Sequence, residues 1–335
     1  CILSIIELPY NEAVRKFIDM YAVRLRNKVS FMLAATNFYM PIFEEALDLY
    51  DLPQELKYLP IIESALNPVA VSRQGATGLW QFMLGTGKIY GLKNNSLIDE
   101  RRDPVKSTWA AARYLKDLYD IYQDWNLVLA AYNCGPGTIN KAIRRAGGAT
   151  DYWTIYNYLP KETRGYVPAF IAANYIMTYY CEHGICPMET QLPNATDTIH
   201  INKDLHLQQV AEVCNIILDQ LRSLNPQYKK DIIPGNSELC ALRLPNNFVS
   251  TFIDRQDSVF AYKPNEYLTK RKTVAIKETT SSRNRSSKGT LYHKIKQGDT
   301  LGGIAAKYHV SISQLRNLNG IKGNNIRAGR SLRIR

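Results

Sequence analysis

Residues 59–68 read Leu-Pro-Ile-Ile-Glu-Ser-Ala-Leu-Asn-Pro and place a single carboxylate, Glu63, in an otherwise apolar stretch. Taking a charge out of water is costly, so a carboxyl group in such surroundings tends to stay protonated near neutral pH. A neutral carboxylic acid can donate a proton to a leaving oxygen atom. The stretch therefore marks Glu63 as a candidate general acid.

Outward from this stretch, residues 10–186 predict a mainly α domain, because apolar residues recur at helical spacing and no alternating strand pattern occurs. Gly75 and Gly78 predict a loop over 69–79, and Asp99, Arg101, Arg102 and Asp103 predict a paired structural network. The expected helices cover 12–26, 31–50 with a break at Pro41, a segment from Pro53 to Glu63, 104–123, 125–133 and 168–180.

The composition changes after Pro187. Residues 198–245 mix strand-like and helical pieces, and residues 263–290 are rich in Lys, Arg, Ser and Thr, which is typical of a flexible linker. Residues 291–335 predict a compact unit in the order strand, helix, helix, strand. We therefore expect one large helical domain and two small α+β units.

The two small units form a repeat. Leu207 to Ala211 corresponds to Leu301 to Ala305, and Leu221 to Asn225 corresponds to Leu315 to Asn319. The earlier copy lacks the Gly-Asp-Thr turn of residues 298–300, so it is the degenerate one. We expect this copy to be structural and to dock on the large domain.

Charge and cysteine content limit the function classes only loosely. The 335-residue chain has a formal net charge of +12 and 45% apolar residues, which suits a soluble core and an acidic partner such as nucleic acid, anionic lipid or an anionic wall polymer. No nucleic-acid recognition motif occurs, and no stretch is apolar enough to span a bilayer. The cysteine spacings fit no metal pattern, so we expect neither a metal nor a cofactor. In an oxidising compartment, Cys181 could form a disulfide with Cys186, and Cys214 could form one with Cys240.

Four motifs follow one another through the helical region. They are Glu63-Ser64, Gly78-Leu79-Trp80-Gln81, Ala131-Tyr132-Asn133-Cys134-Gly135 and Glu162-Thr163-Arg164-Gly165-Tyr166-Val167. With these motifs in this order, residues 10–186 resemble the lysozyme-like catalytic domain of the lytic murein transglycosylases, nearest the membrane-bound type D branch. Residues 291–335 resemble a LysM module and residues 198–245 a degenerate one. Trp80 stands where Met is commoner in the family and Cys134 where Ala is usual; Cys134 could make the site sensitive to oxidation.

The resemblance implies cleavage of the β-1,4 bond between N-acetylmuramic acid and N-acetylglucosamine. Glu63 would protonate the leaving oxygen and then take the proton from the muramoyl C6 hydroxyl, giving a 1,6-anhydro product. Most glycosidases need two carboxylates. No Asp or Glu lies between Ser64 and Leu97, in weak agreement with one Glu that is used twice.

Six further residues are candidates for substrate binding. Ser64 could bond to Glu63 or to the acetamido group, or cap the end of its helix. Gln81 and Asn133 could bind sugar hydroxyl and acetamide groups, or cap the loops at Gly78 and Gly135.

Tyr132 and Tyr166 are expected in the groove wall close to Glu63, on the strength of their motif positions. Trp80 is likewise expected in the groove wall. Glu162 is expected at the groove edge, in a structural ion pair with Arg164 and with a minor substrate role.

In the LysM-like unit, the resemblance implies that N-acetylglucosamine binds in a shallow groove. The candidate binding loops are Asp299-Thr300-Leu301 and Asn324-Asn325-Ile326. Asp299 and Thr300 could instead cap the following helix.

The leading interpretation is a peptidoglycan lytic transglycosylase with a glycan-binding tail. The alternatives are a lysozyme-like hydrolase and a non-catalytic peptidoglycan-binding protein. We expect a monomer in the bacterial periplasm or cell envelope. Because the chain starts at Cys1 rather than Met, we also expect a preceding segment, such as a signal or an outer-membrane anchor.

Overall fold

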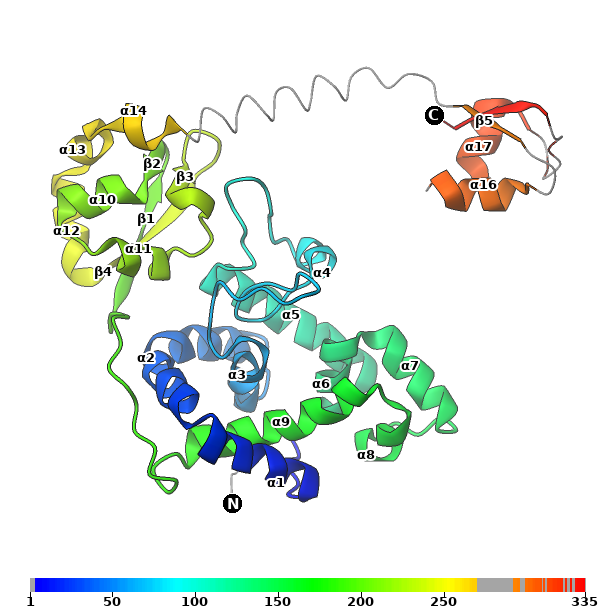
Figure 1. Ribbon diagram of the computed structural model, residues 1–335, viewed down its shortest axis with the longest axis horizontal. Helices are drawn as coiled ribbons and strands as arrows, with labels where there is room; N and C mark the ends of the chain where they lie inside the picture. Colours follow the sequence, from blue (N-terminus) through cyan, green and yellow to red (C-terminus); the bar gives the residue numbers. More distant parts are fainter. Residues whose placement is uncertain are drawn as a thin grey trace. The chain divides into compact units, whose positions relative to one another are not determined.

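The computed structural model describes residues 4–269, 292–295, 299–308, 310, 312–321, 323, 326 and 329–334. The chain divides into two compact units, Cys1–Lys270 and Arg271–Arg335, and each is treated by itself. Within the described ranges, no helix has the length and apolar character needed to cross a membrane. The first unit contains the helical domain and the degenerate copy (Figure 1).

The helical domain is built mainly from α-helices, as the periodicity predicts, with longer loops before and after α4 (Figure 1). Its helices are α1 (Glu12–Asp19), α2 (Arg26–Leu49), α3 (Leu59–Ser64), α4 (Leu84–Ile89), α5 (Pro104–Tyr122), α6 (Trp125–Cys134), α7 (Pro136–Arg145), α8 (Tyr152–Ile155) and α9 (Lys161–Thr178). A π-turn over Met20–Arg24 follows α1, and 3-10 turns cover Gln54–Tyr58 and Tyr156–Tyr158. The mainly α fold class is confirmed.

Two proline positions correct the expected helix bounds. The break expected at Pro41 is absent, because α2 runs through it and buries Phe38, Tyr39 and Phe43 on either side. The helix expected over 168–180 begins instead at Lys161 and holds Pro168 inside it. Burial of apolar side chains on both sides of each proline outweighs the lost backbone hydrogen bond.

A tyrosine repairs the gap that Pro168 leaves in α9. An N–H at position 168 would donate to the carbonyl of Arg164, one helical turn earlier. Pro168 has no N–H, and the hydroxyl of Tyr152 donates to that carbonyl instead, at 3.0 Å. Tyr152 is fully buried, so the bond satisfies an acceptor that water cannot reach. Sequence periodicity alone does not predict this contact between distant segments.

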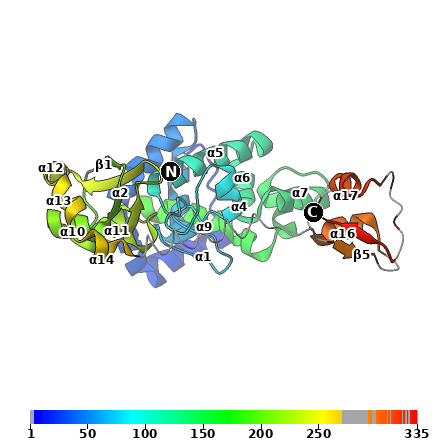
Figure 2. The ribbon, with the colours of Figure 1, turned by 90° about the horizontal axis from the view of Figure 1, so that it is seen from above.

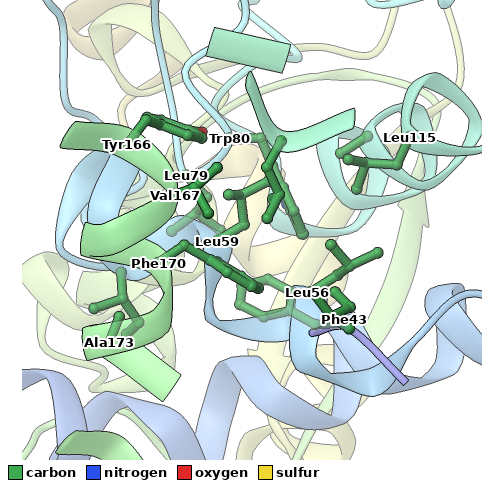
Figure 3. Packing of buried hydrophobic residues seen from close by; sticks show 14 of the residues in the cluster. Phe43, Leu56, Leu59, Leu79, Trp80, Leu115, Tyr166, Val167, Phe170 and Ala173 are labelled. Carbon is green, nitrogen blue, oxygen red and sulfur yellow. The ribbon is translucent and has the colours of Figure 1, made fainter. Parts of the chain in front are cut away.

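The core of the helical domain lies where α2, α3, α5 and α9 meet. Figure 3 shows Phe43, Leu59 and Phe170 packed around Trp80. The rings of Phe43 and Trp80 meet edge to face, with centroids 5.2 Å apart. Leu59 begins α3 and is fully buried, so the core fixes the short helix that ends in Glu63-Ser64.

The degenerate copy pairs β1 (Thr196–Ile201) with β4 (Cys240–Pro245) and β2 (Asp204–His206) with β3 (Ile232–Pro234), both antiparallel. Helices α10 (Leu207–Cys214) and α11 (Leu218–Leu224) lie between the strands in sequence. In Figures 1 and 2 these elements gather together with the helices that follow them. Those helices are α12 (Asn246–Asp254), α13 (Gln256–Ala261) and α14 (Pro264–Tyr267).

The ordered structure continues past residue 245, where the sequence predicts the copy to end. Gln209 donates to the carbonyls of Val259 and Tyr262, and the ring of Tyr267 stacks on His206 at 5.4 Å. Helix α14 therefore occupies the start of the segment 263–290 that was expected to be a flexible linker. Residues 270–290 of that segment lie outside the described residues.

The second unit has the expected order of strand, helix, helix and strand. Strands β5 (Tyr292–Lys294) and β6 (Ser331–Arg333) pair antiparallel, and α16 (Leu301–Tyr308) and α17 (Ile312–Asn319) lie between them in sequence. Its core gathers small aliphatic side chains: Ile295, Leu301, Ile304, Ala305, Leu315, Leu332 and Ile334.

One hydrogen-bond pattern confirms the repeat. In the copy, Asn225 donates to the carbonyls of Leu221 and Arg243 and accepts from the N–H of Arg243. In the second unit, Asn319 makes the same three bonds with Leu315 and Arg333. The same residue thus joins the second helix to the last strand in both units.

The two possible cysteine pairs are not formed. Cys181 and Cys186 are exposed and free, and Cys214 and Cys240 are buried and free. Burial raises the pKa of the Cys214 and Cys240 thiols, to about 11 for Cys240. These two cysteines therefore act as small core side chains.

Candidate active site

Glu63 lies in the last turn of α3. The helix starts after a 3-10 turn, has Pro60 in its first turn and ends at Ala65, whose backbone is left-handed with φ 53°. Leu66 follows with φ 59°. Two consecutive left-handed non-glycine residues are uncommon and turn the chain sharply after the acid.

The side chain of Glu63 is partly buried, and its carboxyl group contacts α9. Tyr166 of α9 is 8% exposed, and its hydroxyl donates a hydrogen bond to Oε1 of Glu63. Burial raises the pKa of Glu63 from 4.5 to about 7; the bond from Tyr166 opposes this rise, and the charge of Glu162 adds to it. A carboxylic acid with a pKa near 7 can both give and take a proton at neutral pH.

Tyr132 of α6 is near enough to the same carboxyl group to feel its charge. Burial raises the pKa of Tyr132 well above its usual value, and the charge of Glu63 raises it further. The hydroxyl of Tyr132 donates to the carbonyl of Trp80 at 2.7 Å. Tyr166 therefore contacts Glu63 directly, and Tyr132 lies within range of its charge.

A row of aromatic rings extends from Tyr132. The ring of Tyr114 lies 5.2 Å from Tyr132 and 5.2 Å from Tyr90, and the Phe82 ring lies 6.4 Å from Tyr114. The sequence analysis did not single out Tyr114 or Tyr90. Their spacing in the sequence is the same as that of aromatic residues in the core. No sequence signal therefore separates an aromatic residue near the site from one in the core.

Ser64 and Gln81 have structural partners. The hydroxyl of Ser64 is 3.1 Å from the carbonyl of Pro60 and 2.9 Å from that of Leu79. Nε2 of Gln81 donates to Gly78 at 2.9 Å, and Gln81 has a left-handed φ of 49°. These contacts favour the capping roles that the sequence left open.

Within the described part of the chain, the side-chain amide of Asn133 is hydrogen-bonded through its oxygen atom and not through its nitrogen atom. Its Oδ1 accepts a hydrogen bond from the buried hydroxyl of Thr163 at 3.0 Å. Its Nδ2 has no hydrogen-bond partner among the residues that the structure describes. Thr163 thus orients an amide that could donate to a sugar acetamide carbonyl. Next to it, burial raises the pKa of the Cys134 thiol, which lowers its reactivity toward oxidants.

Two expectations are wrong. Trp80 does not form a groove wall: its side chain is 1% exposed, Nε1 donates to Thr108 at 2.9 Å, and Figure 3 shows the ring inside the core. Glu162 does not pair with Arg164 among the described side chains, and Nε of Arg164 is buried without a hydrogen-bond partner. Glu162 is exposed in the first turn of α9 and acts on Glu63 through its charge.

The network expected over 99–103 is largely present. Asp99 and Arg101 form a buried ion pair at 2.8 Å, and Asp103 caps α5 by accepting from two backbone N–H groups. Nε of Arg102 is buried without a hydrogen-bond partner, so Arg102 stands outside the network. Across the described ranges, no cluster of His, Cys, Asp or Glu side chains could hold a metal ion.

In the second unit, one candidate loop is tied to the first strand. His293 lies 2.9 Å from Asp299 through Nε2 and 3.0 Å from the hydroxyl of Tyr308 through Nδ1. Leu301 is buried, so it can offer only backbone groups to a ligand, whereas Ile326 is partly buried against the core. Thr300 precedes α16, and Asn324 and Asn325 lie outside the described residues.

Comparison with known proteins identifies the chain. The family described as Transglycosylase SLT domain matches residues 40–155, the family described as Lytic transglycosylase MltD, LysM-like domain matches 195–261, and the LysM domain matches 293–335. The chain is 31% identical over 334 residues to the membrane-bound lytic murein transglycosylase D of Escherichia coli K12, covering 98% of this chain and 70% of that protein. The chain belongs to the lytic murein transglycosylases.

More distant relatives match the catalytic part. The soluble lytic murein transglycosylase of Escherichia coli K12 is 32% identical over 124 residues, covering 35% of this chain and 19% of that protein. The crystal structure of the 70 kDa soluble lytic transglycosylase from Escherichia coli aligns with 28% identity and a TM-score of 0.37, covering 43% of this chain and 24% of that one. The three family matches and the type D relative show that the protein is a peptidoglycan lytic transglycosylase with a LysM-like module and a LysM domain.

Proposed function

We propose that Glu63 is the single catalytic group of this transglycosylase and acts first as an acid and then as a base. The observation that carries the proposal is the partly buried Glu63 side chain, whose pKa is raised to about 7 and whose Oε1 accepts a hydrogen bond from Tyr166. The bond that breaks joins C1 of N-acetylmuramic acid to O4 of N-acetylglucosamine.

In the first step, the protonated carboxyl group of Glu63 donates its proton to the glycosidic oxygen. The C1–O4 bond breaks, the N-acetylglucosamine end leaves as an alcohol, and the acetamido group of the muramoyl sugar supports the positive charge at C1. In the second step, the Glu63 carboxylate takes the proton of the C6 hydroxyl while O6 forms a bond to C1. The product is a 1,6-anhydro sugar, no water is consumed, and Glu63 is protonated again.

Neighbouring residues support this chemistry in different ways. Tyr166 positions the Glu63 carboxyl group, and Tyr132 forms one wall beside it. Nδ2 of Asn133, oriented by Thr163, is the group we assign to the substrate acetamide. Ser64 and Gln81 act through the loop that they hold. Glu162 lies at the edge of the substrate groove, has a minor role in substrate binding and raises the pKa of Glu63 through its charge.

The LysM domain over 291–335 binds N-acetylglucosamine units through Asp299, Thr300 and the backbone near Leu301 and Ile326, together with Asn324 and Asn325. Titration of the full-length protein with N-acetylglucosamine oligomers, followed by NMR, should shift the amide signals of residues 299–301. Unchanged signals there would remove the glycan-binding role. The protein acts as a monomer, and its relative described as membrane-bound supports a place in the bacterial cell envelope.

The decisive experiment analyses digested peptidoglycan by mass spectrometry. The wild-type protein should release fragments that end in 1,6-anhydro-N-acetylmuramic acid. Glu63→Gln keeps the shape of the side chain but cannot exchange a proton, and should lower the rate about 10⁴-fold. Glu162→Gln removes a carboxylate from the same region and should cost far less. Reducing ends alone would indicate a hydrolase, and full activity of Glu63→Gln would refute the assignment.

A further inference from the structure

The LysM-like module (195–261) is joined to the catalytic domain by backbone hydrogen bonds. The N–H of Lys229 donates to the carbonyl of Leu97 at 2.6 Å, and the N–H of Asp99 donates to that of Gln227 at 2.9 Å. Ile98 and Tyr228 thereby form an antiparallel bridge. This bridge joins the module to the segment that precedes α5.

Side chains reinforce the contact. Nζ of Lys229 donates to Oδ1 of Asn94 at 3.0 Å and to the carbonyl of Asn95 at 2.7 Å. Lys93 of the catalytic domain forms an ion pair with Glu238 of the module. The module therefore holds the whole segment 93–99.

Arg101, which follows the segment 93–99, holds the loop over 75–82 by hydrogen bonds. The guanidinium group of Arg101 binds both carboxylate oxygens of Asp99, at 3.0 and 2.8 Å. Its remaining nitrogen donates to the carbonyls of Gly75 and Phe82, at 3.0 and 3.1 Å. One buried side chain thus joins the two ends of the loop, and Asp99 holds that side chain in place.

The clamped loop reaches the groups beside Glu63. The carbonyl of Leu79 lies 2.9 Å from the hydroxyl of Ser64, and the carbonyl of Trp80 accepts from Tyr132 at 2.7 Å. A set of polar contacts therefore runs from Gln227 of the module through Asp99 and Arg101 to the loop that contacts Ser64 and Tyr132.

Other parts of the chain cover the LysM-like module at the positions that correspond to the candidate glycan-binding loops of the LysM domain. His206 precedes Leu207, the counterpart of Leu301, and carries the stacked ring of Tyr267. The segment between Asn225 and Ile233, the counterpart of 319–326, lies against Leu97 and Asp99. Both candidate glycan-binding edges are thus occupied by the chain itself.

We propose that the LysM-like module is a positioning element of the catalytic domain rather than a glycan-binding module. Lys229 holds the segment 94–97, and the carbonyl of Gln227 holds Asp99 at the end of that segment. Asp99 in turn fixes Arg101, which holds the loop 75–82 that supports Ser64 and Tyr132. The inference rests on the proposed role of Glu63. Small displacements at a catalytic centre can lower a rate by up to about 10²-fold, so loosening this contact should act mainly on kcat.

The first test compares Lys229→Met with Lys230→Met in the full chain. Lys230 is the next residue in the chain, is exposed and has the same side chain, so it is a matched control. Lys229→Met should speed amide exchange at residues 75–82 and lower kcat on soluble glycan fragments about tenfold, with KM nearly unchanged. Lys230→Met should do neither, and Lys229→Arg should recover part of the loss.

The second test reverses the charges of the Lys93–Glu238 pair, which is more exposed to solvent than the Asp99–Arg101 pair. Lys93→Glu and Glu238→Lys should each lower kcat, and the double variant should restore it. Amide exchange is measured without substrate, so it reports on the module even if the role of Glu63 is wrong. Unchanged exchange at 75–82 in Lys229→Met, or changed exchange with unchanged kcat, would overturn the proposal. If Lys229→Met does not fold, a double variant that fails to restore kcat would overturn it.

Discussion

The hydroxyl of Tyr166 donates a hydrogen bond to Oε1 of Glu63, from a helix about 100 residues farther along the chain. The bond favours the ionised carboxylate and lowers the pKa of Glu63, while burial raises it by more. Tyr166 therefore does two things: it orients the acid and keeps its pKa from rising further.

Tyr166→Phe should separate these two effects. Without the hydroxyl, the pKa of Glu63 rises above about 7, so the loss of activity at alkaline pH moves to higher pH. The maximum rate should fall about tenfold or more because the carboxyl group is less well oriented. The measurement is kcat against pH on soluble glycan fragments. Tyr158→Phe alters an exposed tyrosine and should leave the profile unchanged; an alkaline limb that stays in place in Tyr166→Phe would contradict the argument.

Glu63→Gln should stabilise the protein at alkaline pH. The pKa of Glu63 is raised in the folded state, so its contribution to stability is fully present below 4.5 and is lost as pH rises through about 7. Gln carries no charge at any pH, so the variant should gain up to about 3 kcal/mol over the wild type at pH 8 and little at pH 4. Denaturant unfolding at both pH values checks this. An equal difference at both would show that Glu63 keeps a normal pKa when folded.

The partly buried position of Glu63 could be predicted from sequence because it depends on a local pattern, a lone carboxylate after apolar residues; its catalytic role stays a prediction. The repeat could also be predicted, since both copies keep the same Asn at the end of the second helix. Helix order follows from periodicity in the same way.

Other features depend on contacts between distant segments. Trp80 occupies the core because Thr108 of α5 accepts its N–H, and α9 continues through Pro168 because Tyr152 supplies the missing donor. The row from Tyr132 to Tyr90 is formed only when α5 and α6 pack together. None of these partners lies near the other in sequence, so a local pattern cannot reveal them.

Gly78→Ala should disrupt the loop beside Glu63. Gly78 has φ +90°, and a Cβ at this position would lie 1.8 Å from the carbonyl oxygen of Arg101. The loop must therefore move away from Arg101, and we expect a loss of at least about 2 kcal/mol in unfolding free energy with a strong loss of activity. Gly85→Ala is the control, because that helical position has open space and Ala should be neutral or stabilise by up to about 1 kcal/mol. Equal stability of the two variants would show that the loop adapts freely.

Tyr152→Phe should destabilise the protein, and Pro168→Ala should remove most of that effect. The Tyr152 hydroxyl satisfies the carbonyl of Arg164, which Pro168 leaves without a backbone donor. Loss of a buried partner costs about 1–3 kcal/mol when the acceptor is left unsatisfied. With Ala at position 168, a backbone N–H can donate to that carbonyl, so Tyr152→Phe should cost less in that background. Unfolding free energies of the four proteins in this cycle measure the coupling, and additive effects would mean that the hydroxyl does not substitute for the missing N–H.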